Sequence, residues 1–276
     1  MINLGRTQTL NVIRVDERGL WLGSEAEPVL LPRREGEEAR VGDTLTVFVF
    51  GLHDGIAQAT RQRPRAEVGE FALFPVSQLT EHGAFVDWGI GKELLVPFRK
   101  QPVRMELGQA YLLKVCLDRE GRPFGNGRID SCLEAPPSTL SAGSKVDLLL
   151  WQFTDLGAKM IVNQRYGGLL YRDELPAMAS PGDRFSGYVR QLRADGKLDL
   201  TLRAVGVDAA EEARSALLAA LGRNGSLPLN DQSPPEQIQQ LVGLSKKSFK
   251  KALGGLYRAG VVEMTSSGIR LKKKMA

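Results

Sequence analysis

The 276-residue sequence contains few of the residues that carry covalent and metal chemistry. It has two histidines, His53 and His82, and two cysteines, Cys116 and Cys132. Two cysteines give no disulfide framework, and these four dispersed residues lack the spacing of a zinc site. We therefore expect no metal and no cofactor, and we expect reduced, packed thiols such as those of a cytoplasmic protein.

Long apolar runs are absent as well. The longest, such as Leu148–Trp151, fall far short of the roughly 20 residues that a bilayer-spanning helix needs. The start, Met1–Arg6, lacks the apolar region of a signal peptide. We expect a cytoplasmic protein with no membrane partner.

The motifs of common enzyme families are missing. The sequence has no Walker-type phosphate loop, no dinucleotide fingerprint and no nucleophile elbow. Gly89-Ile90-Gly91 lacks the third glycine and precedes a predicted strand, so it is interpreted as a turn. No carboxylate stands at a motif spacing from His82, and Asp195 and Asp199 flank a predicted hairpin rather than form a metal-binding cluster. The sequence predicts no enzymatic activity.

Charge is unevenly distributed along the chain. Hydrophobic residues make up 42% and charged residues 25%, which is typical of a globular protein. The net charge is +5, and residues 208–276 hold 11 Lys and Arg against 6 Asp and Glu, so this segment accounts for the whole excess. Such a segment indicates either a polyanionic partner or a solvated basic face.

The segment Glu81–Phe98 reads as two short strands joined by a turn between glycines. Side chains alternate across a strand, so Ala84 and Phe85 point to opposite faces. One face would form the core of a small barrel. The other would carry Phe85, a histidine at its edge and a basic flank: His82, Lys92, Arg99 and Lys100. This combination suits base stacking beside a phosphate track, although Phe85 can also be read as a core residue.

The same pattern occurs twice more, at residues 17–33 and 155–172. Each copy is followed by a turn and an alternating strand, starting at Val41-Gly42-Asp43, Leu107-Gly108-Gln109 and Pro181-Gly182-Asp183. Repetition at the length of a small domain indicates tandem modules. We expect domains at 1–63, 66–134 and 141–205, each with five short strands that close a barrel. In the second module the fifth strand is expected at Asn126–Ile129.

The hydrophobic period changes at about residue 208. Ala209–Leu221 has helical spacing, a second helix is expected with Ser233 as its N-cap, and a third is expected after Ser245. A hairpin of Val261–Met264 and Gly268–Leu271 follows, so residues 208–276 are predicted to form a winged helix-turn-helix. Four lysines recur along one side of the third helix: Lys246, Lys247, Lys250 and Lys251. They would contact nucleic acid, or form a solvated face or one that faces the barrels.

At Gly83–Gly89 with Leu94–Pro97, the chain resembles the ribosomal S1 domain, an oligonucleotide-binding barrel. In that family the residue before the first glycine, an aromatic residue two positions after it and a residue on the next strand contact RNA. The corresponding residues are His82, Phe85 and Pro97 in the second module, Arg18, Trp21 and Pro32 in the first, and Leu156, Lys159 and Tyr171 in the third. The first and third sets depart from the family pattern of aromatics and a histidine.

Tandem barrels followed by a winged helix resemble the bacterial conserved virulence factor B family over nearly the whole chain. The resemblance implies RNA binding and post-transcriptional control, including virulence regulation, without catalysis. We therefore expect a mainly β protein with a C-terminal α+β domain: three five-stranded OB-fold (S1-like) barrels and a winged helix. The candidate RNA-binding residues are Arg18, Trp21, His82, Phe85, Lys92, Arg99, Lys100, Lys159, Tyr171, Arg172, Lys246, Lys247, Lys250 and Lys251.

Two other functions fit the same pattern. The protein could be an interaction scaffold on the ribosome or RNA polymerase, or a DNA-binding regulator that uses the winged helix. The sequence leaves the target RNA and the oligomeric state open.

Overall fold

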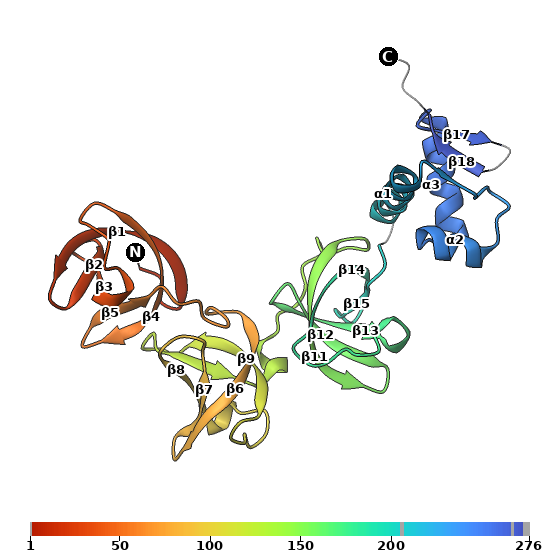
Figure 1. Ribbon diagram of the computed structural model, residues 1–276. Coiled ribbons are helices and arrows are strands. Elements are labelled where there is room, and N and C mark those ends of the chain that lie inside the picture. Colours follow the sequence, from red (N-terminus) through yellow and green to blue (C-terminus); the bar gives the residue numbers. More distant parts are fainter. Residues whose placement is uncertain (1, 205–206, 266–267, 273–276) are drawn as a thin grey trace. The chain divides into compact units, whose positions relative to one another are not determined.

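A computed structural model describes residues 2–204, 207–265 and 268–272 (Figure 1). The chain divides into two compact units, one of Met1–Pro136 with Asp147–Arg184 and the other of Pro137–Val146 with Phe185–Ala276. This division falls within the third barrel, so the four domain boundaries expected from the sequence stay a prediction. No helix among the described residues is both long and apolar enough to cross a membrane.

The first barrel is closed, with the strand order β1-β2-β3-β5-β4. Its strands are β1 (Arg6–Asp16), β2 (Gly19–Gly23), β3 (Pro28–Pro32), β4 (Thr44–His53) and β5 (Ile56–Thr60). The parallel pairing of β3 with β5 closes it. Its core is aliphatic and includes the fully buried Leu20, Leu22 and Leu31. The strands expected from the sequence all lie within these elements: Leu10–Val15, Leu20–Leu22, Val29–Leu31, Thr44–Phe50 and Ile56–Thr60.

The second barrel has the corresponding order β10-β9-β6-β7-β8, but its outer strands β8 and β10 are not hydrogen-bonded to each other. Its strands are β6 (Phe71–Thr80), β7 (Gly83–Asp87), β8 (Glu93–Pro97), β9 (Ala110–Leu117) and β10 (Pro123–Asn126). The expected fifth strand at Asn126–Ile129 is wrong. The Asp118 carboxylate accepts from the backbone N–H of Glu120 and of Arg122, which closes the hairpin early, so pairing already begins at Pro123.

The third barrel is closed in the order β11-β12-β13-β15-β14. Its strands are β11 (Lys145–Thr154), β12 (Gly157–Val162), β13 (Tyr166–Tyr171), β14 (Arg184–Leu192) and β15 (Leu198–Thr201). They match the strands expected from the sequence to within two residues at each end: Lys145–Phe153, Lys159–Asn163, Gly168–Tyr171, Arg184–Leu192 and Leu198–Leu202. A short 3₁₀ turn follows the third strand of every barrel: η1 (Arg33–Glu35), η2 (Phe98–Lys100) and η4 (Arg172–Glu174).

One hairpin recurs in all three barrels and fixes the register of the candidate site. The glycine that opens the second strand pairs with the last residue of the third, as Gly19 with Pro32, Gly83 with Pro97 and Gly157 with Tyr171. In the second barrel Thr80 Oγ1 donates to the Gly83 carbonyl at 3.1 Å, and a threonine makes the same contact in the third barrel and in the C-terminal hairpin. The positions matched from the sequence are therefore equivalent in space.

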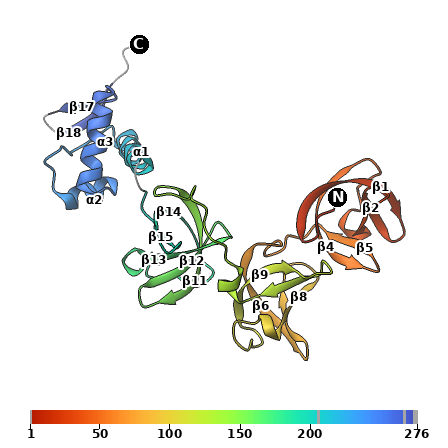
Figure 2. The same cartoon turned by 180° about the vertical axis from the view of Figure 1, so that it is seen from behind.

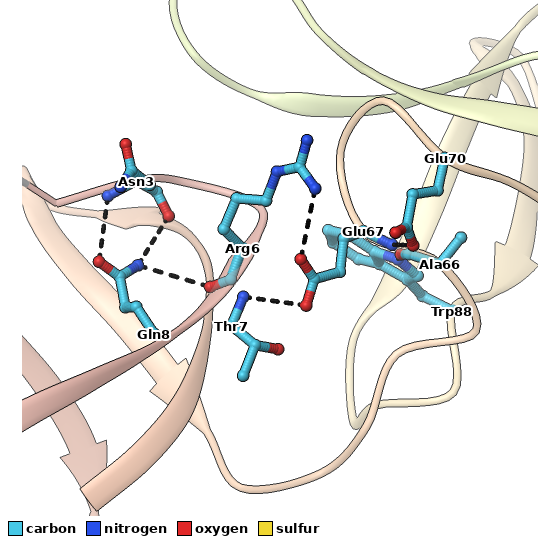
Figure 3. A network of polar contacts seen from close by, with 8 residues as sticks. All are labelled: Asn3, Arg6, Thr7, Gln8, Ala66, Glu67, Glu70 and Trp88. Carbon is cyan, nitrogen blue, oxygen red and sulfur yellow. Dashed lines mark hydrogen bonds and ion pairs between the residues drawn. The ribbon is translucent and has the colours of Figure 1, made fainter. Parts of the chain in front are cut away.

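The first two barrels share a packed junction (Figure 3). The Glu67 carboxylate accepts from the backbone N–H of Thr7 at 3.0 Å and lies 3.5 Å from the Arg6 guanidinium. Trp88, directly after β7, donates from Nε1 to the Ala66 carbonyl at 2.8 Å. Phe48 of the first barrel belongs to the same buried cluster as the core of the second. Trp88 therefore has a structural role at the contact between the two barrels.

The C-terminal domain consists of α1 (Val207–Asn224), β16 (Ser226–Leu227), α2 (Pro235–Val242), α3 (Lys246–Arg258), β17 (Val262–Thr265) and β18 (Gly268–Leu271) (Figure 2). Its sheet has the order β16-β18-β17. Phe249 and Leu256 of α3 and Ile269 of β18 lie in one buried cluster. The predicted plan of three helices and a hairpin is confirmed, and with the three barrels it confirms the mainly β fold class.

Of the N-caps expected for α2 and α3, the one for α2 is wrong. Ser245 is the N-cap of α3, since its hydroxyl accepts from the backbone N–H of Ser248 at 3.2 Å. The N-cap of α2 is Pro234 rather than Ser233. Ser233 instead closes the preceding turn, where its hydroxyl accepts from the backbone N–H of Asn230 at 2.9 Å. That local bond satisfies the hydroxyl one residue before the helix.

Candidate nucleic-acid interface

A groove of about 730 Å³ lies in the first unit, between β7, β8 and η2, the hairpin of β9 and β10, and the end of β4. All five residues expected to bind RNA in the second barrel line it: His82, Phe85, Lys92, Arg99 and Lys100. They come from separate turns and strands, and the barrel brings them together. We call this cavity the junction groove, because β4 belongs to the first barrel.

Phe85 reaches the junction groove because of strand alternation. Its neighbours Ala84 and Val86 are fully buried in the barrel core, whereas Phe85 is half-buried and lines the groove. Phe85 pairs across the sheet with Leu95, which lines the groove as well. The ring therefore lies on the face opposite the core, as the alternating pattern predicts.

Lysines stand beside aromatic rings at two places in the groove. Lys92 Nζ lies 5.5 Å from the ring centroid of Phe50, and Lys100 Nζ lies 5.8 Å from that of Phe124. Such distances allow cation–π attraction. Lysine ammonium groups held next to rings offer a phosphate contact and a stacking surface side by side.

The groove also contains acidic groups, and one of them is paired. Arg122 Nε donates to Asp118 Oδ2 at 2.8 Å. The backbone N–H and then the guanidinium of Arg122 hold the pKa of Asp118 below its usual range. Glu93 is the other acidic residue of the lining. With Lys92, Arg99, Lys100 and Arg122 against these two carboxylates, the groove has a net positive charge.

His82 is exposed at the edge of the groove. Its Nε2 lies 3.7 Å from Glu81 Oε1, and its side chain is 75% exposed. An adjacent glutamate that is itself exposed does not fix the ring in the way that a buried orienting group would. This geometry suits a contact at the rim of a binding site.

The sequence did not indicate Phe50 and Phe124 as lining residues. Phe50 lies on β4 of the first barrel, and Phe124 lies on β10, directly opposite Cys116 of β9. The available signal was the alternation of these strands. It could not place Phe50 at the second barrel, because that placement depends on the packing of the junction.

The aromatic platform expected on the first barrel is covered. Trp21 is only 5% exposed, and the guanidinium carbons of Arg14 and Arg18 lie 4.5 and 5.3 Å from its ring centroid. Its Nε1 donates to Asp16 Oδ2 at 2.7 Å. Desolvation raises the pKa of Asp16, but hydrogen bonds from Trp21 and Arg18 outweigh it, so that the pKa is lowered. Trp21 is a candidate from the sequence because an exposed ring could stack on a base. In the structure its ring is covered, so it offers no open stacking surface.

In the third barrel, Lys159 and Arg172 already contact other groups of the protein. Lys159 Nζ lies 4.7 Å from the ring centroid of Trp151 and 3.7 Å from Asp130 Oδ1. Tyr171 is half-buried at the end of β13. Arg172 is exposed, and its Nη2 lies 3.5 Å from the Thr154 carbonyl. These residues lie outside the junction groove.

The lysines of α3 form the exposed face that the helical spacing predicts. Lys247, Lys250 and Lys251 are exposed, whereas Phe249 and Leu253 are buried on the opposite side. Lys246 is half-buried, and its Nζ donates to the Gln232 carbonyl at 3.4 Å. Three of the four lysines therefore point freely into solvent.

Three small β-barrels in series, a basic groove with aromatic rings and a winged helix define a multidomain protein of the nucleic-acid-binding class. Residues 4–62 match the family model of the S1 domain, and residues 215–271 match that of the CvfB-like winged helix domain. Both matches support nucleic-acid binding, and neither family is an enzyme family. Among the described residues, no group of three or more His, Cys, Asp or Glu is placed to hold a metal.

The chain is similar to conserved virulence factor B of Staphylococcus saprophyticus, with 23% identity over 98% of this chain and 95% of the relative. It is also similar to the uncharacterized protein YitL of Bacillus subtilis, with 25% identity over 94% and 90%. A crystal structure of a multidomain protein with nucleic acid binding domains from Streptococcus pneumoniae covers 98% of both chains at 22% identity, with a TM-score of 0.42. The resemblance to the conserved virulence factor B family is confirmed.

Proposed function

We propose that the protein binds single-stranded or structured RNA in the junction groove and acts as a post-transcriptional regulator of gene expression. The observation that supports this proposal is the convergence of His82, Phe85, Lys92, Arg99 and Lys100 on one cavity. They are the residues that the S1 resemblance and its basic flank indicate for RNA contact. The post-transcriptional role is what the resemblance to the conserved virulence factor B family implies.

Two kinds of contact would provide the affinity for RNA: base stacking and phosphate binding. A base stacked on Phe85 contributes about 1–3 kcal/mol and tolerates any base, because every base has a π face. Contacts of Lys92, Arg99 and Lys100 with phosphates release counterions and make binding fall steeply with salt. Exposed lysines of the winged helix would add further phosphate contacts. In this proposal the protein acts by binding alone and carries out no reaction.

The test is an anisotropy titration of the full chain with labelled single-stranded RNA at several salt concentrations. Arg99→Glu in η2 is compared with Arg34→Glu, which occupies the matching position of η1 and does not line the groove. We expect Arg99→Glu to weaken RNA binding and to lower the salt slope by about 1, and Arg34→Glu to leave both nearly unchanged. Equal losses in the two variants, or none in either, would contradict a site in the junction groove.

A DNA-binding role is the second candidate, and the exposed lysines of α3 are the observation that favours it. Duplex DNA and single-stranded DNA of the same sequence serve as competitors in the same titration. Tighter binding of duplex DNA than of RNA would favour the DNA-binding regulator. The absence of binding to any nucleic acid would favour a protein-interaction scaffold on the ribosome or RNA polymerase. Crosslinking in cells, followed by sequencing of the bound RNA, would identify the targets.

A further inference from the structure

The two cysteines of the chain meet on one face of the second barrel. Cys116 lies on β9, and Cys132 ends the 3₁₀ turn η3 (Ile129–Cys132). Lys114, two residues before Cys116 and therefore on the same face of β9, donates from Nζ to the Cys132 carbonyl at 3.1 Å. This bond holds the end of η3 over the face that carries Cys116. Both side chains are half-buried, so small molecules in solution can reach them.

The surroundings make the two thiols unequal. The neighbouring Cys116 thiol, followed by Ser131, Lys114 and Lys100, outweighs desolvation and lowers the pKa of Cys132 to about 6. The nearby Cys132 sulfur, followed by burial, raises the pKa of Cys116. At neutral pH the pair is therefore a thiolate next to a protonated thiol. A thiolate with a neighbouring thiol is the arrangement found at redox-sensing cysteines.

We propose that Cys116 and Cys132 form a hydroperoxide-sensitive thiol pair that closes to an intramolecular disulfide. The Cys132 thiolate attacks one peroxide oxygen, the O–O bond breaks, and the departing hydroxide takes a proton to become water. The resulting Cys132 sulfenic acid is attacked by the Cys116 sulfur, which gives up its proton. The S–O bond breaks and a second water leaves. Two thiols are oxidised by two electrons, and one hydroperoxide is reduced.

The second step is favoured by the first. As long as Cys132 is a thiolate, its negative charge keeps the proton on Cys116. A sulfenic acid is neutral, so this restraint disappears once Cys132 has reacted, and Cys116 is then free to attack. A disulfide requires Cβ atoms about 3.5–4.5 Å apart. Cys132 ends the single 3₁₀ turn η3, so only this short segment has to move to reach that separation.

The test uses the full chain, whose only cysteines are these two. The reduced protein is treated with hydrogen peroxide, alkylated and weighed intact. We expect a mass lower by two hydrogen atoms, no alkyl adduct, a monomer on a non-reducing gel, and full reversal by dithiothreitol. Before oxidation, Cys132 should be alkylated at neutral pH roughly tenfold faster than Cys116, because the thiolate is the nucleophile.

Two serine variants separate the roles. Cys116→Ser should stop at the sulfenic acid, which dimedone captures, and Cys132→Ser should react with peroxide at least about tenfold more slowly than the wild type. Differential alkylation of the wild-type chain gives the same information if a variant fails to fold. The proposal is overturned if Cys116 stays open to alkylation while Cys132 proceeds to sulfinic acid, if only disulfide-linked dimers form, or if the two cysteines are alkylated at equal rates.

Discussion

The ring of Phe48 in the first barrel meets the ring of Trp88 in the second barrel edge to face, with ring centroids 5.3 Å apart. Both side chains are 1% exposed. Truncating a buried Phe removes its transfer free energy and leaves a cavity, which lowers the free energy of unfolding by about 3–5 kcal/mol. We therefore expect Phe48→Ala to destabilise the second barrel as well as its own.

Denaturant titration of the full chain would measure this effect, with a single tryptophan retained at Trp88 to report on the second barrel. Phe153→Ala is a suitable control, because this Phe is 47% exposed on β11. Its unfolding midpoint should change by the equivalent of about 0.5 kcal/mol or less. If Phe48→Ala leaves the Trp88 transition unchanged, the two barrels are energetically independent.

Phe85→Ala should weaken RNA binding by about 1–3 kcal/mol through the loss of a stacking surface. Its neighbour Val86 is fully buried, so Val86→Ala should lower the melting temperature instead and leave the affinity of the folded protein nearly unchanged. An RNA titration and a thermal melt of both variants make a two-by-two comparison. A large fall in melting temperature for Phe85→Ala with unchanged RNA affinity would mean that the ring packs the barrel and does not bind RNA.

Trp21→Ala should behave in the opposite way to Phe85→Ala. The Trp21 ring is buried beneath Arg14 and Arg18, so its removal should lower thermal stability and change RNA affinity by no more than about 0.5 kcal/mol. The measurement is the same pair of titration and melt. An affinity loss as large as that of Phe85→Ala would show that the two arginines move aside for the ligand.

Replacing Lys247, Lys250 and Lys251 together by Ala should weaken binding to RNA of every sequence. Three phosphate contacts to single-stranded RNA contribute about 2 to the slope of log affinity against log salt, and the slope should fall by that amount. Lys246→Ala is the internal control, since its Nζ already donates to the Gln232 carbonyl. An unchanged slope in the triple variant would assign these lysines to a solvated or protein-binding face.

Gly83→Ala should destabilise the second barrel. Gly83 has φ of +147°, and a Cβ there would lie 2.3 Å from the Val96 carbonyl oxygen. Backbone strain alone amounts to about 1–3 kcal/mol, and the close approach adds to it. Gly91→Ala in the next turn is the matched control, because no heavy atom lies within 4 Å of a Cβ at that position. Equal melting temperatures for the two variants would contradict this account of the hairpin.

The sequence predicted the parts of the fold that depend on short-range periodicity. Alternation placed Ala84 and Val86 in the core and Phe85 outside it, and helical spacing placed a band of lysines on the side of α3 away from Phe249 and Leu253. Both outcomes depend only on the repeat of side-chain direction along one element. The glycine turns likewise gave the register of the three hairpins, because each turn admits few backbone conformations.

Features that depend on contacts between elements were not predictable in this way. Trp21 was expected on an open face, but Arg14 and Arg18 cover its ring and Asp16 holds its indole N–H. Phe50 reaches the junction groove only because the first barrel packs against the second. The sequence of a single strand does not show where the turn to its partner strand ends. The fifth strand of the second barrel was therefore predicted too close to the C-terminus.

The threonine-to-glycine contact that closes a hairpin in two of the barrels also closes the hairpin of the winged helix, where Thr265 Oγ1 donates to the Gly268 carbonyl at 3.2 Å. An S1-type barrel and a winged helix are different architectures. The shared contact is therefore a local way to reverse a strand, available to any chain that places a threonine three residues before a glycine. Matching turns within one protein are therefore poor evidence that its parts arose by duplication. Agreement of both strand order and register between whole barrels is better evidence.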